Sequence, residues 1–110
     1  MNRIPMSAAA AALLRALIAR ARVPRDRILL TDVRSFDWQS LTFVGERHEF
    51  QFRITGLDSS AVADRLCRDL EETEFSISGQ IVADVTVAER LECSQNGFVT
   101  VKIQALTIAE

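Results

Sequence analysis

Two runs of alternating apolar and polar residues constrain the fold of this chain more than any other feature. Between residues 80 and 108, apolar side chains recur at most alternate positions, with a break at Gln95-Asn96-Gly97. Such alternation is typical of strands that bury one face, and a short glycine-containing break between two strands predicts a hairpin. We therefore expect an antiparallel sheet whose longest hairpin joins residues 80–93 to residues 98–108.

The parity of this hairpin predicts its turn. A two-residue turn at Asn96-Gly97 would place the apolar sets of the two strands on opposite faces of the sheet. A three-residue loop, Gln95-Asn96-Gly97, sets Cys93 opposite Val99 and needs a left-handed glycine at Gly97. We expect this bulged turn, which gives one shared apolar face made of Ile81, Ala83, Val85, Val87, Leu91, Val99, Val101, Ile103 and Ala105.

A second hairpin is expected upstream, where Leu41 and Phe43 alternate with polar residues, as do the apolar positions of residues 50–54. Pairing Phe43 with Phe50 keeps all the apolar side chains on one face and leaves residues 45–48 in the loop. One extra short strand near residues 28–33 is left open. Trp38 lies in a polar stretch, where a tryptophan is expected to anchor a loop to the core.

Two amphipathic helices complete the pattern. Ser7 is a suitable N-cap for a helix over residues 7–22, which Pro24 stops, and Asp58 or Ser59 caps a second helix over residues 59–72. The chain of 110 residues is expected to be a single α+β domain, with residues 1–24 as a basic helical arm. Its predicted order is this helix and then ββαββ, with a predominantly antiparallel sheet and the helices packed on one face.

The charge is distributed unevenly along the chain. Residues 1–27 hold six arginines and one aspartate, whereas the remainder holds seven basic and fourteen acidic residues. The arm is therefore expected to dock near the acidic residues 69–74, either of its own chain or of a sister subunit, or to bind an acidic partner. Nucleic acid is not an expected partner, because the acidic body would repel phosphate and no recognition motif is present.

The chain has more apolar surface than its core needs, which indicates an interaction or assembly domain without enzymatic activity. We expect it to form homo-oligomers, and another protein partner is left open. The second face of the 80–108 hairpin carries apolar residues that a solvated face does not need. The candidate interface residues on this face and on the arm are Leu13, Arg15, Leu17, Arg20, Phe98, Leu106 and Ile108. The long edge strand would also invite pairing with another chain.

The alternative function is a small-ligand-binding domain with an aromatic pocket between sheet and helices. The candidate pocket residues are Trp38, Phe43, Phe50 and Phe52. Aromatic residues at strand spacing are, however, more typical of an ordinary core.

No motif predicts a catalytic residue, a cofactor or a metal. His48, the only histidine, is expected as a solvated turn residue, and Cys67 and Cys93 as reduced thiols. Arg15 interrupts the apolar run that begins at Ala8, so no membrane span is expected, and cytoplasmic location is the default. An organellar presequence within residues 1–25 is the less favoured interpretation of the same composition.

Overall fold

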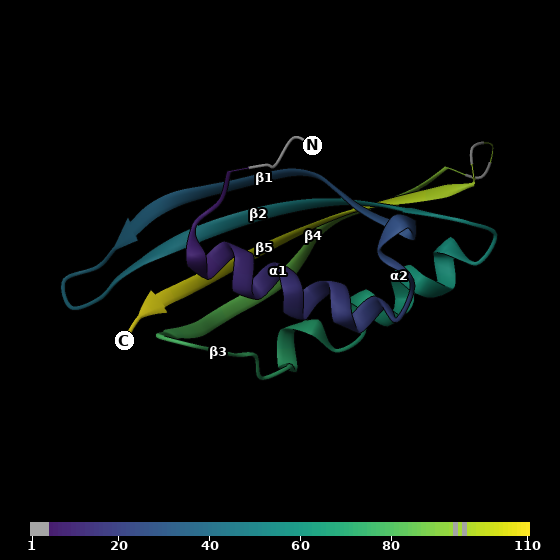
Figure 1. Ribbon diagram of the computed structural model, residues 1–110. Coiled ribbons are helices and arrows are strands. Elements are labelled where there is room, and N and C mark those ends of the chain that lie inside the picture. The colour runs from purple at the N-terminus through teal and green to yellow at the C-terminus, as the bar shows by residue number, and fades with distance from the viewer. Residues whose placement is uncertain (1–4, 94, 96) are drawn as a thin grey trace.

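The computed structural model describes residues 5–93, 95 and 97–110, which form two helices and a five-stranded sheet (Figure 1). The elements in chain order are α1 (Ala8–Ala21), the 3₁₀ turn η1 (Arg25–Arg27), β1 (Ile28–Gln39), β2 (Val44–Thr55), α2 (Ser59–Cys67), the 3₁₀ turn η2 (Leu70–Glu72), β3 (Ser76–Ile77), β4 (Gln80–Cys93) and β5 (Phe98–Ala109).

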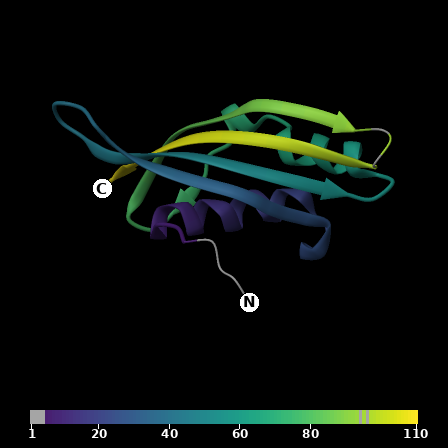
Figure 2. The same ribbon diagram turned by 90° about the horizontal axis from the view of Figure 1, so that it is seen from above.

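The sheet has the strand order β1-β2-β5-β4-β3, and every neighbouring pair is antiparallel. Both helices lie on one side of it (Figures 1 and 2). The α+β class and the antiparallel sheet are therefore confirmed. The predicted order is only partly matched, because the extra strand is a full member of the sheet and the short β3 was not expected.

The first helix packs onto its own chain. The Ser7 side chain accepts a hydrogen bond from the backbone N–H of Ala10 at 3.1 Å, and the helix ends where Arg22 takes a left-handed conformation. Leu13 and Leu17 are fully buried in the core. The arm thus docks on the body of the same chain, and its leucine stripe forms part of the core.

The second helix is shorter than predicted. It ends at Cys67, and Asp69 takes a positive φ of 51° before the separate turn η2 begins. A left-handed residue cannot continue an α-helix, so the expected single helix over residues 59–72 is divided in two.

The core lies between the helices and one face of the sheet. Strands β2 and β5 line it with alternate residues, since successive side chains of a strand point to opposite faces. Its largest members are fully buried. They include Leu13, Leu17, Phe50, Phe52, Ile54, Val62, Leu66, Val99, Val101 and Ile103.

The prediction for the first hairpin was wrong in register. Strand β1 extends to Gln39 and pairs along its length with β2, so Trp38 lies opposite Gly45 in the sheet. The turn comprises residues 40–43, and Leu41 and Phe43 in it are exposed. Leu41 and Phe43 alternate with polar residues as in a strand, although they lie in the turn. A bulge at Thr31 interrupts the alternation of β1.

The second hairpin has the predicted bounds but different faces. Register shifts between Val82 and Asp84 and between Val87 and Glu89 each insert one residue into β4. Each inserted residue reverses the side on which later residues lie. As a result Ile81 lies on the face away from the helices, and Val82 on the face toward them.

The turn of this hairpin also differs from the prediction. Cys93 pairs with Phe98, one position before the expected Val99, and the Gly97 N–H donates to the Cys93 carbonyl at 3.0 Å. Gly97 has a φ of +66°, so the expected left-handed glycine is present. The full predicted loop includes Asn96, which lies outside the described residues.

Candidate functional site

The candidate site is the face of the sheet opposite the helices, here called the open face. No described helix covers it (Figures 1 and 2). Residues paired across antiparallel strands point to the same face, so the register assigns this face in rows. Two rows at one end, across β1, β2, β5 and β4, are Trp38–Gly45–Ile108–Ile81 and Phe36–Arg47–Leu106–Asp84.

Five apolar side chains gather in these two rows, and we call them the apolar end: Phe36, Trp38, Ile81, Leu106 and Ile108. Phe36 is 51% exposed and Ile81 is 50% exposed, while the other three are partly exposed. Burying half-exposed side chains of this size would stabilise a complex by about 1 kcal/mol each. The apolar end is therefore a surface on which contact with a partner would be favourable.

Gly45 leaves bare backbone in the middle of the outer row. A Cβ atom placed there would lie 2.0 Å from the carbonyl oxygen of Thr107, so no side chain fits at this position. The outer row therefore has no side chain between Trp38 and Ile108.

Two charged residues, Arg47 and Asp84, stand on either side of Leu106 in the inner row. Within the part of the chain that the structure describes, neither forms an ion pair. Both side chains belong to exposed residues, so water solvates their charges in the single chain.

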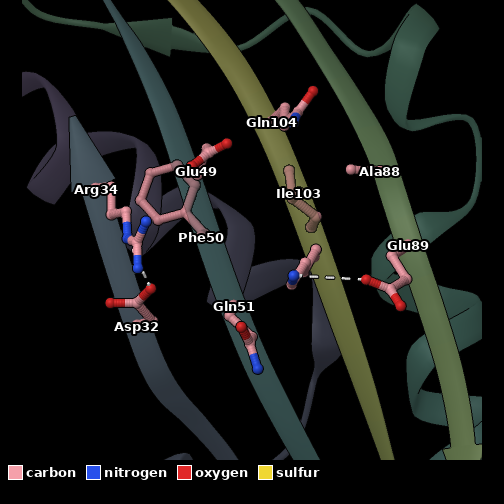
Figure 3. Close-up of a pocket in the computed structure, with 10 residues that line it drawn as sticks. Asp32, Arg34, Glu49, Phe50, Gln51, Ala88, Glu89, Ile103 and Gln104 are labelled. Atoms are coloured by element: carbon pink, nitrogen blue, oxygen red, sulfur yellow. Dashed lines mark ion pairs between the residues drawn. The ribbon is translucent and has the colours of Figure 1, made fainter. Parts of the chain in front are cut away.

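The middle of the open face is a polar band with two ion pairs (Figure 3). Its residues are Asp32, Arg34, Glu49, Gln51, Glu89, Lys102 and Gln104. Arg34 lies 3.3 Å from Asp32, and Lys102 lies 3.5 Å from Glu89. The band surrounds a shallow hollow of about 350 Å³. Exposed pairs of this kind contribute about 0–1 kcal/mol each, and the band offers no nucleophile with an adjacent base.

The turn between β1 and β2 is a further apolar feature at the same end of the sheet. Leu41 is 105% exposed, and Phe43 and Val44 are also exposed. The Ser40 side chain accepts a hydrogen bond from the Phe43 N–H at 3.1 Å, which orders the turn. Apolar surface thus extends from the apolar end to the turn.

The predicted interface residues fall into separate groups. Leu106 and Ile108 lie at the apolar end, but Phe98 lies at the other end of β5, where the Arg53 guanidinium stands 4.7 Å from its ring centre. Leu13 and Leu17 are in the core. The two arm cations differ, since Arg15 is exposed whereas Arg20 donates hydrogen bonds to the carbonyls of Leu66 and Arg68 and to the Thr73 hydroxyl.

The predicted pocket residues do not come together. Phe50 and Phe52 are buried under the helices with their rings stacked, centroids 6.3 Å apart. Trp38 lies on the open face, and Phe43 lies in the exposed turn. The four aromatics therefore do not line one cavity.

His48 is buried in the core, so its prediction as a solvated turn residue was wrong. Its Nδ1 lies 2.8 Å from the Ser35 hydroxyl, and its Nε2 lies 2.8 Å from the Thr107 hydroxyl. Burial lowers the pKa of His48, an effect that the nearby Glu46 carboxylate partly offsets. Two neutral hydroxyl partners and a lowered pKa make His48 a neutral structural residue.

Sequence reasoning missed three side chains of the site, Phe36, Arg47 and Ile81, whereas Asp84 was expected on the same face as Leu106 and Ile108. Phe36 and Trp38 are two positions apart, a spacing that is typical of a strand and could have predicted that β1 extends through them. Ile81 was expected on the opposite face, because the bulge at Ala83 is marked by no local residue preference.

Comparisons with known protein families, with characterised proteins and with solved structures give no match to this chain. Among the residues that the structure describes, no group of three or more His, Cys, Asp or Glu side chains is placed to hold a metal ion. Neither described helix is long and apolar enough to cross a membrane.

Proposed function

We propose that this chain is an assembly domain without enzymatic activity, and that it forms a homodimer through the apolar end of its open face. The observation that carries the proposal is the arrangement of the inner row, in which Arg47 and Asp84 stand on opposite sides of Leu106. Apolar residues with charges of both signs beside them can complement a second copy of themselves.

A two-fold axis along β5, between two facing sheets, satisfies this complementarity. The axis sets Leu106 and Ile108 against the same residues of the second copy. Arg47 then faces Asp84 of the second copy, and the symmetry repeats this pair. In the outer row, Ile81 faces Gly45 of the second copy, which has no side chain to oppose it.

The same axis limits the contact to the apolar end. Lys102 would meet its own copy farther along β5, about 13 Å from Leu106 at the usual rise per residue. Because face-to-face sheets cross at about 30°, each β5 is inclined by about 15° to the axis, so the two Lys102 side chains are displaced sideways from each other and stay hydrated. A contact limited to the apolar end is smaller than a standard interface, and we expect a reversible dimer.

Sedimentation velocity over a concentration series tests the proposal. The wild-type chain should shift from monomer to dimer as its concentration rises. Ile81→Lys should remain monomeric because it buries a charge at the interface. Leu91→Lys is the matched control, since Leu91 is similarly exposed on the same face of β4, at the far end. A wild-type chain that stays monomeric, or equal effects of both variants, would overturn the proposal.

The proposal includes a cytoplasmic location and no membrane or nucleic-acid partner, and a small-ligand-binding domain is its alternative. The free thiols of Cys67 and Cys93 support a reducing compartment.

Native mass spectra of the untagged chain distinguish assembly from ligand binding. A monomer that retains a stoichiometric small molecule would favour ligand binding, whereas a ligand-free dimer would support assembly.

A further inference from the structure

A second feature of the molecule lies on the helical side, where four arginines line one hollow. The hollow has a volume of about 530 Å³ and lies between the C-terminal ends of α1 and α2. Arg20 and Arg22 reach it from α1 and its cap, and Arg65 and Arg68 from α2 and its cap. Asp69 is the single acidic residue of the lining.

Two of these arginines are held in place by backbone carbonyls. Arg20 donates from Nε to the Leu66 carbonyl at 3.1 Å, and Arg65 donates from Nε to the Ala21 carbonyl at 3.1 Å. Each thereby caps the C-terminal end of the other helix, where carbonyl groups lack partners within the helix. These bonds order both guanidinium groups and leave some of their N–H donors unused.

The other two arginines have no such structural task. Arg22 and Arg68 are exposed, and their side chains form no hydrogen bond with any described residue. Across the described part of the chain, none of the four hollow arginines lies within ion-pair distance of a carboxylate. Four cations against Asp69 leave the hollow with a surplus of three positive charges, in a chain whose net charge is −2.

We propose that this hollow binds the phosphoryl group of a small phosphorylated molecule. The planar guanidinium group donates paired hydrogen bonds that match the oxygens of a phosphate, and two of the four groups are already ordered. The volume falls within the range typical of small-molecule sites. Glu71, Glu72 and Glu74 follow directly in the chain and disfavour an extended polyanion such as nucleic acid.

Isothermal titration calorimetry with pyrophosphate, at constant ionic strength in chloride, tests the site. Wild-type protein should bind one pyrophosphate per chain with a saturable heat. The double variant Arg22→Gln/Arg68→Gln should weaken binding about tenfold or more, because it removes two guanidinium groups that would donate charge-assisted hydrogen bonds to the phosphate. Both substitutions spare the carbonyl-capping arginines, so the thermal unfolding temperature should change little.

Arg15→Gln/Arg25→Gln is the matched control, because it removes the same charge at exposed arginines outside the hollow. This control should bind pyrophosphate as the wild type does. Equal weakening in both double variants, or no saturable binding by the wild-type chain, would overturn the proposal. A single-stranded oligonucleotide serves as a probe of the competing ligand class. If it bound more tightly than pyrophosphate, and Arg22→Gln/Arg68→Gln weakened that binding, the ligand would be a polyanion and the small-molecule proposal would be overturned.

Discussion

The two faces of the sheet are built from the same strands but differ in what completes them. On the covered face, the alternate residues of β2 and β5 are buried beneath α1 and α2, and His48 finds both of its hydrogen-bond partners within the chain. On the open face, the polar band holds two ion pairs, yet the apolar end stays uncovered and neither Arg47 nor Asp84 forms an ion pair with a described residue. The covered face is fully packed within one chain, whereas the apolar end of the open face stays exposed in the single chain.

This difference predicts unequal responses to truncation. Phe52→Ala on the covered face should lower the free energy of unfolding by about 3–5 kcal/mol, because it removes a fully buried ring and leaves a cavity. Phe36→Ala on the open face should lower it by less than about 1 kcal/mol in dilute solution. Urea denaturation monitored by circular dichroism measures both. A large loss for Phe36→Ala would mean that the apolar end already serves the stability of the single chain.

The buried histidine gives the covered face a dependence on pH. The pKa of folded His48 is lowered from 6.5, so below about that pH the unfolded chain binds a proton that the folded chain does not. The free energy of unfolding should therefore fall as the pH decreases from 7 to 5. His48→Gln should cost about 1–3 kcal/mol at pH 7, because it disturbs the bonds to Ser35 and Thr107, and it should flatten the pH dependence.

Denaturation of wild type and His48→Gln at several pH values checks this sign. His48 is the only histidine, and Asp58 and Glu92, whose pKa values are lowered by hydrogen bonds from Arg27 and from Ser60 and Arg90, titrate below this window. A wild-type chain whose stability is constant between pH 5 and 7 would contradict the neutral, buried state of His48.

The ion pairs of the two faces should also differ in the stability that they contribute, and this is the smallest of the expected differences. Arg90 ties β4 to α2 through Asp64 at 2.7 Å and also contacts Glu92 at 2.9 Å. Arg34 on the open face pairs with Asp32 alone. Arg90→Gln should cost about 1 kcal/mol and Arg34→Gln about 0–0.5 kcal/mol. Thermal unfolding at low and high salt compares them, and equal costs would remove the distinction.

The sequence predicts well the elements whose ends and periods are marked by local residues. Ser7 and Pro24 bracket the first helix, and the alternation of residues 80–108 locates β4 and β5 within a residue or so. The first hairpin was misplaced because Leu41 and Phe43 continue an apolar alternation into a turn. Their exposure is a property of the tertiary structure, which a local pattern does not carry.

The candidate site was harder to predict than the fold, for the same reason. Leu106 and Ile108 follow from the clean alternation of β5, which has no bulge. The neighbouring Ile81 was assigned to the wrong face because it lies in β4 before an inserted residue, which changes the face of the residues after it. The juxtaposition of Arg47 with Leu106 required the correct register of β2, which the misplaced turn obscured.

Mixing two charge variants tests the proposed two-fold contact most directly. Arg47→Asp alone and Asp84→Arg alone each place like charges against each other in a homodimer, so each should sediment as a monomer. In an equimolar mixture, both contacts join opposite charges again, and a heterodimer as stable as the wild-type dimer should form. If the mixture stays monomeric while the wild-type chain dimerises, Arg47 does not face Asp84 of a second copy, and the account of the open face fails.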